Sequence, residues 1–292
     1  MDRSRSGGTD RSPERTVDRS TDRTDALSRL QSAGRYALEL EAVSRHFGAL
    51  VALADINLAV RAGERRAVLG SNGAGKTTLF NAITGDFPVT TGRVRFFGED
   101  VTDLAPQHRI RRGLRRTYQI SLLFGSLSVL DNVYLAAQGV SGGRFSLRRP
   151  SASDPRMEQA RTLTEAVRLD HVRDVAVDEL SYGQQRQLEI GLALAGAPRF
   201  ILFDEPAAGL SPTERGELIE VLGALPAHMG YIIIEHDMDV ALRVAESVTM
   251  MHNGRVFAEG TPDEIEADPR VQELYLGAGH DAGHGAGHAG GH

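Results

Sequence analysis

The chain contains a single lysine, Lys76, although lysine and arginine together number 33 in its 292 residues. Lys76 lies in Gly70–Thr77, which reads Gly-Ser-Asn-Gly-Ala-Gly-Lys-Thr and has the spacing of a phosphate-binding P-loop. In such a loop the glycines let backbone N–H groups wrap around phosphates, and the ammonium reaches between them as a compact point charge. The Thr77 hydroxyl can ligate Mg²⁺. We therefore expect a nucleotide-phosphate site at the start of a helix, whose N-terminus adds positive potential.

Two acidic residues follow an apolar run about 130 residues after the P-loop. Phe200–Phe203 has the pattern of a buried parallel strand, and Asp204 and Glu205 come directly after it. Asp204 is placed to hold Mg²⁺ through water, and Glu205 to polarise an attacking water as a general base. The alternative is an ordinary strand end with solvated carboxylates. Together with a P-loop, the pair indicates nucleotide hydrolysis.

Gln119 and His236 are candidates for sensing the terminal phosphate. Gln119 lies between the core pattern and a helical middle region, and His236 follows the apolar run Ile232–Ile234. A histidine at a strand end is commonly structural. Its place directly after a buried strand of a P-loop sheet favours a catalytic role.

A second helix start has the residues to bind an anion. Ser181 and Gln184 have the S-x-x-Q spacing of a capping box, and Gly183 between them leaves its backbone open. One interpretation is simply a well-capped helix. The other is a second anion-binding helix N-terminus.

Periodicity predicts the elements that carry these residues. Strands are expected at 38–42, 56–60, 67–69, 92–98, 200–203, 231–234, 248–251 and 255–258, the last two joined at Asn253-Gly254 as a hairpin. Helices are expected from Thr77 to near Gly85, over much of 106–191, and over 212–225. Within the middle region, Asp154 begins a helix whose core-facing stripe is Met157, Ala160, Leu163, Ala166 and Val167. The strand–helix–strand order predicts a parallel sheet with crossovers.

Composition narrows the function classes. The net charge of −6 and the 5% aromatic content argue against nucleic-acid binding. The chain has no cysteine, hence no disulfides, and no 18-residue apolar run. Residues 1–35 are expected to form a disordered arm and 278–292 a disordered Gly/His-rich tail. The tail histidines either bind Zn²⁺ or Ni²⁺ weakly or have no role.

Taken together, residues 36–277 resemble the nucleotide-binding domain of ABC transporters. The family fold is an α/β P-loop NTPase with a parallel core sheet, an antiparallel β subdomain and a helical subdomain, here at about 120–191. Gln119 matches the Q-loop glutamine, a further Mg²⁺ ligand, and His236 the switch histidine. Phe47 matches the aromatic residue that stacks on adenine. The segment Leu180–Gln185 resembles the family signature, with Tyr182 in place of its first glycine. The ATP contacts implied by the resemblance are Phe47, Gly70, Ser71, Asn72, Gly73, Ala74, Gly75, Lys76, Thr77, Thr78, Ser181, Gly183 and Gln184.

The resemblance also implies partners and a location. ATP lies between the P-loop of one subunit and the signature of another, in a head-to-tail homodimer or heterodimer. This dimer sits on integral-membrane permease subunits at the cytoplasmic face and works indirectly with a substrate-binding protein. Several segments look like those of ATPases of branched-chain amino-acid importers: 180–190, 204–210, 234–238, 260–265, 268–271 and 275–277. The alternatives are a urea or short-amide importer, and a soluble ABC ATPase outside transport.

Overall fold

The centre of the protein is a six-stranded sheet. The computed structural model describes residues 35–117, 123–140 and 154–280. The strand order is β10-β9-β3-β8-β7-β6, in which every neighbouring pair is parallel except β10 with β9. These strands are β3 (Arg65–Gly70), β6 (Leu114–Arg116), β7 (Phe200–Asp204), β8 (Gly230–Ile234), β9 (Ser247–His252) and β10 (Arg255–Gly260). Because β3, β7 and β8 are parallel, the residues that follow them gather at one edge of the sheet.

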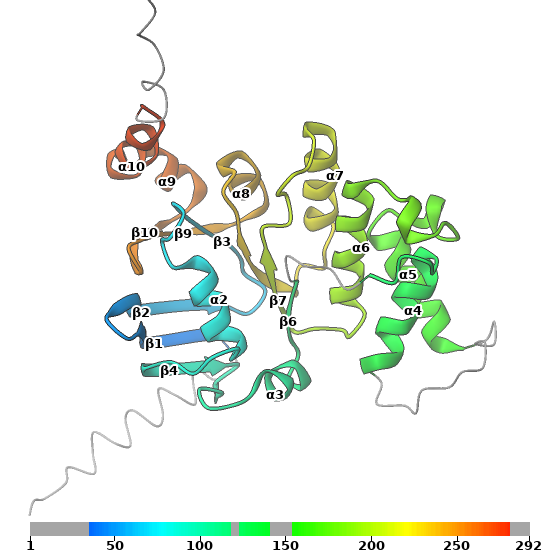
Figure 1. Cartoon of the computed structure of the whole chain (residues 1–292), viewed down its shortest axis with the longest axis horizontal. Helices are drawn as coiled ribbons and strands as arrows, with labels where there is room; N and C mark the ends of the chain where they lie inside the picture. The colour runs from blue at the N-terminus through cyan, green and yellow to red at the C-terminus, as the bar shows by residue number, and fades with distance from the viewer. Residues whose placement is uncertain (1–34, 118–122, 141–153, 281–292) are drawn as a thin grey trace, which may run out of the picture.

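A second, antiparallel sheet lies beside the first and has the order β2-β1-β4-β5 (Figure 1). Its strands are β1 (Tyr36–Phe47), β2 (Leu50–Arg61), β4 (Thr91–Phe96) and β5 (Glu99–Asp100). A large apolar cluster joins this sheet to the helix that follows the P-loop and to one face of the parallel sheet. The antiparallel sheet therefore forms one wall around the P-loop.

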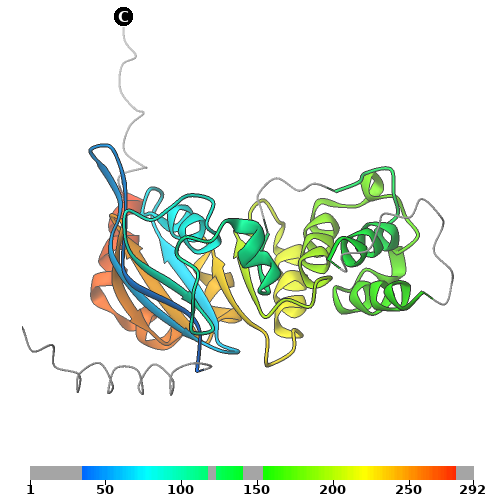
Figure 2. The same ribbon diagram turned by 90° about the horizontal axis from the view of Figure 1, so that it is seen from below.

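Outside the two sheets, most of the described residues are helical. The helices are α2 (Lys76–Thr84), α3 (Pro106–Arg111), α4 (Val129–Val140), α5 (Pro155–Ala166), α6 (Tyr182–Leu194), α7 (Pro212–Gly223), α8 (Met238–Val244), α9 (Pro262–Ala267) and α10 (Pro269–His280), with 3-10 turns η1 (Asp170–Val172) and η2 (Val177–Glu179). Helices α4, α5 and α6 pack on one another at the end of the molecule far from β1, β2 and β4 (Figures 1 and 2). The architecture is thus the predicted combination of a parallel core sheet, an antiparallel β part and a helical part.

The parallel strands are buried on both faces, which explains their continuous apolar sequence. In β7, Ile201 and Phe203 face the cluster formed with the helices, whereas Phe200 and Leu202 face the cluster shared with the antiparallel sheet. This alternation follows the two-residue period of a strand. The predicted hairpin is also present, with left-handed backbone at Asn253 (φ 48°) and Gly254 (φ 73°).

The sequence pattern missed β6. The stretch from about residue 106 was expected to be helical, but Leu114–Arg116 is a strand that pairs in parallel with β7. Three residues are too few to display a two-residue period, and the pairing partner lies more than 80 residues away in sequence. Tertiary pairing rather than local preference determines this strand.

Two small residues are exposed against expectation: Ala42, which alternates with Leu38 and Leu40 in the expected strand 38–42, and Ala166, in the expected core-facing stripe. Ala42 is exposed, with φ 49°, because β1 has a bulge between Leu40 and Val43 that turns Val43 inward instead. Ala166 is exposed at the end of α5, although it was expected in the core-facing stripe. Thr164 is buried there instead, and its hydroxyl donates to the carbonyl of Ala160 at 2.8 Å.

The expected terminal segments fall largely outside the described residues. Residues 1–34 and 281–292 lie there, including His284, His288 and His292. Helix α10 extends to His280, beyond the expected start of the tail at residue 278. Extending an existing helix needs no new nucleus, so the glycines at its end are tolerated. Within residues 35–117, 123–140 and 154–280, no helix has the length and apolar character needed to cross a membrane.

Candidate active site

The P-loop connects β3 to α2 and is held by close backbone contacts. A side chain at Gly70 would place its Cβ 2.3 Å from the carbonyl oxygen of Met251, and one at Gly75 would lie 2.7 Å from that of Ala52. Gly75 also has φ 100°, which favours glycine. The N–H of Gly254, in the β9–β10 hairpin, donates to Ala74 at 2.9 Å. The hairpin and β2 therefore support the loop from outside.

Lys76 is the first residue of α2 and is only 5% exposed. Its ammonium donates to the carbonyl oxygens of Gly70 at 2.7 Å and Ser71 at 3.2 Å. Burial lowers the pKa of Lys76, and the charges of Glu205 and Asp204 partly offset that effect. The ammonium is thus held inside the loop by two carbonyl oxygens, and the acidic residues at the carboxyl end of β7 favour its charged form.

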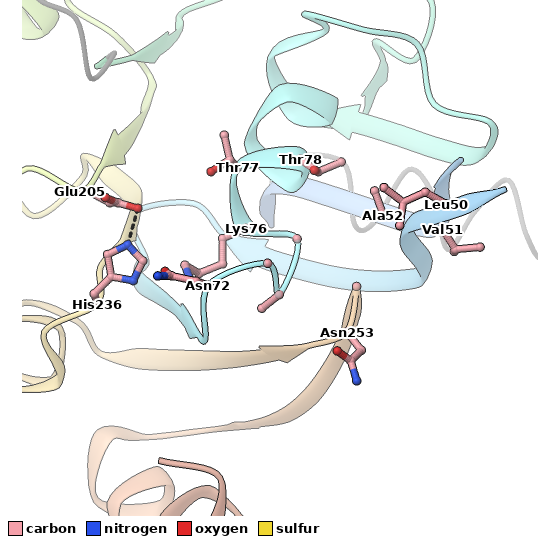
Figure 3. A pocket seen from close by; sticks show the side chains of 14 residues that line it. Leu50, Val51, Ala52, Asn72, Lys76, Thr77, Thr78, Glu205, His236 and Asn253 are labelled. Carbon is pink, nitrogen blue, oxygen red and sulfur yellow. Dashed lines mark hydrogen bonds and ion pairs between the residues drawn. The ribbon is translucent and has the colours of Figure 1, made fainter. Parts of the chain in front are cut away.

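Glu205 and His236 come together at the edge of the parallel sheet. Glu205 follows β7 with a left-handed backbone (φ 51°), and its N–H donates to Ile234 at the end of β8 at 2.9 Å. Its Oε1 lies 2.6 Å from Nε2 of His236 (Figure 3). The strained turn and the strand pairing aim both side chains toward the P-loop. A carboxylate paired with an imidazole is suited to accepting a proton from water.

These residues line an open cleft of about 430 Å³ (Figure 3). The lining consists of Leu50, Val51 and Ala52 of β2, Asn72, Gly73, Ala74, Gly75, Lys76, Thr77, Thr78, Glu205, His236, Asn253 and Gly254. Most of the P-loop residues, Glu205 and His236 are therefore brought together. Sequence reasoning missed the contribution of β2 and of the hairpin tip. The Asn-Gly pair signalled the hairpin but not what it approaches.

Asp204 is buried at the end of β7, beside the cleft rather than in its lining. Its Oδ2 accepts from Arg116 at 2.7 Å, and both side chains are nearly inaccessible to solvent. Its Oδ1 is buried and has no hydrogen-bond partner within the described part of the chain. One oxygen of the Asp204 carboxylate is thus paired with a guanidinium, while the other is available to bind a ligand.

Phe47 is not among the residues that line the cleft. Phe47 is 44% exposed at the end of β1 and packs edge-on against Phe87, with ring centroids 5.5 Å apart. The guanidinium of Arg45 lies 4.4 Å from the Phe47 ring centroid. Gln119 lies outside the described residues. On this side, Leu50, Val51 and Ala52 of β2 supply apolar residues to the cleft lining.

The N-terminus of α6 holds an anion from the same chain. Ser181 and Gln184 form the predicted capping box. The N–H of Gly183 donates to Oε1 of Glu214, on α7, at 3.0 Å. Hydrogen bonds donated by Ser211, and to a smaller extent by the N–H of Gly183, hold the pKa of Glu214 below its ordinary value. This end of α6 therefore accommodates a carboxylate, and Ser181, Gly183 and Gln184 are not among the residues that line the cleft.

Glu235 is a buried carboxyl group that sequence reasoning passed over, although it lies next to His236. It is 2% exposed, and its Oε1 accepts from the N–H of Ala207 at 2.8 Å. Burial raises the pKa of Glu235 to about 7, and donation from the N–H groups of Ala207 and His236 only partly offsets it. The charges of Glu205 and Asp237 raise it further. This group links the turn after β7 to the segment that carries His236.

The raised pKa of Glu235 makes stability depend on pH. The pKa is about 7 in the folded chain and 4.5 ordinarily, so the folded state binds more protons between these values and loses stability as pH rises through them. From pH 5 to pH 8, we expect the unfolding free energy of the wild type to fall by roughly 2–3 kcal/mol relative to Glu235→Gln. Thermal unfolding at both pH values measures this difference. Exposed Glu266→Gln, on α9, is the control, and parallel pH curves for wild type and Glu235→Gln would contradict the assignment.

The fold and the site define a P-loop NTPase of the ATP-binding-cassette type. Residues 53–208 match the family model described as ABC transporter, and residues 255–281 match the one described as branched-chain amino acid ATP-binding cassette transporter. The chain is 34% identical over 254 residues to the high-affinity branched-chain amino acid transport ATP-binding protein BraF of Pseudomonas aeruginosa, covering 83% of this chain and 98% of BraF.

Solved structures agree with this assignment. The ADP conformation of MJ1267, an ATP-binding cassette of an ABC transporter, has a TM-score of 0.73 at 31% identity, covering 83% of this chain and 99% of MJ1267. The dimeric structure of MJ0796, a bacterial ABC transporter cassette, has a TM-score of 0.65 at 25% identity, covering 77% of this chain and 98% of MJ0796. The chain belongs to the ABC transporter family of ATPases, in the branch that contains BraF.

Proposed function

We propose that this chain is the ATP-hydrolysing subunit of an importer of branched-chain amino acids. The observation that carries the ATPase part is the convergence of Lys76, Glu205 and His236 on one cleft at the carboxyl edge of the parallel sheet. The substrate part is supported by the likeness to BraF over nearly its whole length and by the match of residues 255–281. In the proposed importer the substrate does not reach this subunit, so family likeness alone supports that assignment.

The cleft suggests how the residues share the hydrolysis of ATP. Lys76 and the loop N–H groups bind the β- and γ-phosphates. Glu205 accepts a proton from water as the water oxygen bonds to the γ-phosphorus, and the bond from that phosphorus to the β–γ bridging oxygen breaks. His236, 2.6 Å from Glu205, orients the carboxylate. The products are ADP and phosphate.

We propose that Mg²⁺ accompanies the nucleotide. The residues fit this ion, since Thr77 supplies a hydroxyl and Asp204 a carboxylate whose buried Oδ1 lacks a hydrogen-bond partner among the described residues. The described residues hold no cluster of three or more His, Cys, Asp or Glu side chains that could bind a metal alone. Mg²⁺ commonly completes its shell with phosphates and water. When bound, it neutralises charge that develops on the phosphate oxygens.

The working assembly we propose is a head-to-tail dimer of this chain, or of this chain with a second ABC ATPase. It would rest on membrane permease subunits at the cytoplasmic face and work with a substrate-binding protein. The dimeric MJ0796 cassette supports the pairing. The separation of the cleft from the α6 N-terminus supports it too, because the cleft of one subunit could then meet the α6 N-terminus of the other. Glu214 must move away for a phosphate to reach Gly183.

Uptake measurements test the transport assignment. Cells that lack this chain are expected to lose most high-affinity uptake of labelled leucine and to keep uptake of labelled urea. The wild-type chain should restore leucine uptake, and the matched variant Lys76→Ala should not. Loss of urea uptake instead would indicate a urea or short-amide importer. Unchanged uptake of both would favour an ATPase outside transport.

A further inference from the structure

Arg116 makes a buried connection among the segments that are expected to surround Mg²⁺. It is the last residue of β6. One of its guanidinium nitrogens, Nη2, donates to Oδ2 of Asp204 at 2.7 Å. The other, Nη1, donates to Oδ1 of Asn81 on α2 at 2.5 Å and to Asp86 at 3.1 Å. The guanidinium thus spans from the strand that ends in Asp204 to the helix that begins with Lys76.

The position of Asn81 on α2 shows which face of this helix Arg116 contacts. Asn81 lies four residues after Thr77, so the two side chains share one face of the helix. Arg116 therefore forms a hydrogen bond to the helix face that also carries Thr77. Its other terminal nitrogen forms a hydrogen bond to Asp204. The two groups that we expect to serve Mg²⁺ are held relative to each other through one arginine.

Strand β6 adds a second fixing point for Asp204. The N–H of Thr117 donates to Leu202 at 2.9 Å, and the hydroxyl of Thr117 accepts from the N–H of Asp204 at 3.2 Å. Backbone and side chain of Asp204 are thus both fixed by consecutive residues, Thr117 and Arg116. Gln119, the third expected ligand, follows three residues after Arg116 but lies outside the described residues.

The two oxygens of Asp204 are in different situations. Oδ2 is committed to Arg116, whereas Oδ1 is buried without a hydrogen-bond partner in the described part of the chain. A buried carboxylate oxygen without a partner is costly, so a ligand for Oδ1 is expected. Rotation of the carboxyl group would break the bond to Arg116. The ion pair therefore fixes the orientation of the carboxylate and leaves one oxygen to a ligand.

We infer that Arg116 is a positioning residue for magnesium: it holds Asp204 by Oδ2 and α2 by Asn81, so that Oδ1 and the Thr77 hydroxyl face one Mg²⁺ site. This inference rests on the proposed function, specifically on the use of Mg²⁺ with the nucleotide. Arg116 touches neither phosphate nor metal in this role. It acts as an outer partner of a metal ligand, a kind of contact that commonly tunes metal affinity.

Charge alone predicts the opposite effect, which makes the inference testable by its sign. If Arg116 were only a nearby positive charge, removing it would strengthen Mg²⁺ binding, because like charges repel. If it positions Asp204, removing it weakens Mg²⁺ binding by roughly 10–100-fold, as for other outer partners of metal ligands. The two roles therefore give opposite shifts in the same titration.

The experiment measures binding without turnover. Fluorescently labelled ADP is added to the full chain, and Mg²⁺ is titrated to obtain its apparent affinity; a second series in EDTA gives the nucleotide affinity without metal. For Arg116→Gln, we expect the Mg²⁺ affinity to fall roughly 10–100-fold and the affinity in EDTA to remain within about twofold. Arg116→Lys, which keeps the charge but loses the planar fork, should fall between this variant and the wild type.

Two further variants separate positioning from misfolding. Asn81→Ala removes only the contact on α2, leaves the ion pair in place, and should also weaken Mg²⁺ binding. Arg112→Gln removes a surface arginine that pairs with Glu99 and should change nothing. Thermal unfolding confirms that each variant is folded, and if Arg116→Gln is not, Arg116→Lys and Asn81→Ala still decide.

Unchanged or stronger Mg²⁺ binding in the folded Arg116 and Asn81 variants would overturn the positioning role while leaving the proposed ATPase intact. A wild-type chain whose nucleotide affinity does not respond to Mg²⁺ would instead refute the magnesium site itself, and the role of Arg116 with it.

Discussion

Replacing Glu205 with glutamine is expected to slow ATP hydrolysis by roughly 10²–10⁴-fold, the usual effect of losing a general base, while ATP binding persists. Glutamine has the size of glutamate and keeps an oxygen that can accept from His236, 2.6 Å away in the wild type. It cannot take a proton from water near neutral pH. Steady-state phosphate release gives the rate, and equilibrium binding of labelled ATP gives the affinity.

The matched control is Glu217→Gln, since Glu217 is an exposed glutamate on α7. It should hydrolyse ATP at the wild-type rate. Because binding persists without turnover, Glu205→Gln should also accumulate with ATP as a stable dimer if the head-to-tail assembly is correct. A Glu205→Gln chain that releases phosphate at more than about a tenth of the wild-type rate would contradict the assignment of Glu205 as the base.

Local sequence was enough to identify the parts of the site that depend on short segments. The P-loop is defined by eight consecutive residues, Gly70–Thr77, and its helix begins where the motif requires. Glu205 and His236 were each found because they follow buried apolar strands. Their proximity follows from one further fact, that β7 and β8 are parallel neighbours and end at the same edge. A strand–helix–strand pattern predicts that arrangement.

The parts that were not predicted depend on contacts between distant segments. Arg116 reaches Asp204 only because β6 pairs with β7, and β6 is too short to be recognised from periodicity. The pKa of Glu235 is raised because the fold buries its carboxyl group, and the N–H of Ala207, in the turn after β7, only partly offsets that effect. In neither case does the residue type or its neighbours in sequence signal the partner. The roles of such residues can be recognised only once the fold shows which charged groups are buried together.

Phe47 illustrates a different limit. The family resemblance assigns it to adenine, and sequence spacing alone cannot say where the ring rests before a nucleotide arrives. In the structure the ring packs against Phe87 and Arg45, at the side of the cleft lined by Leu50 and Val51. Stacking on adenine would replace the contact with Phe87 by one of similar kind. Its assignment as a nucleotide contact stays a prediction.

Replacing Lys76 with alanine is expected to weaken ATP binding by about 10²-fold, because an ammonium that bonds to phosphate contributes roughly 1.5–3 kcal/mol or more. Lys76 is buried within the loop and already bonded to the carbonyl oxygens of Gly70 and Ser71. It is therefore oriented before the phosphates arrive. Titration with labelled ATP measures the loss, and thermal unfolding checks that the variant is folded. Affinity within about threefold of the wild type would contradict this role.

Lys76→Arg is the informative control, because the chain uses arginine at every other basic position. The guanidinium keeps the charge, but it is planar and larger than the ammonium, and Lys76 is only 5% exposed. We expect Lys76→Arg to bind ATP nearly as weakly as Lys76→Ala. A near-normal Lys76→Arg chain would show that charge alone is needed here, and would leave the single lysine unexplained.

Lys76→Ala also tests whether each ATP site is composed of residues from two subunits. Lys76→Ala disables the P-loop, and Ser181→Arg would block the signature end of α6, so each dimer of one variant alone should be inactive. In a mixed dimer, the intact P-loop of one subunit faces the intact signature of the other. An equal mixture should therefore recover about a quarter of wild-type hydrolysis, since half of the dimers are mixed and each has one complete site of two. Recovery requires subunit exchange, which size-exclusion chromatography of tagged chains can verify. If mixed dimers form and stay inactive, the complete site cannot be composed of a P-loop and a signature from different chains.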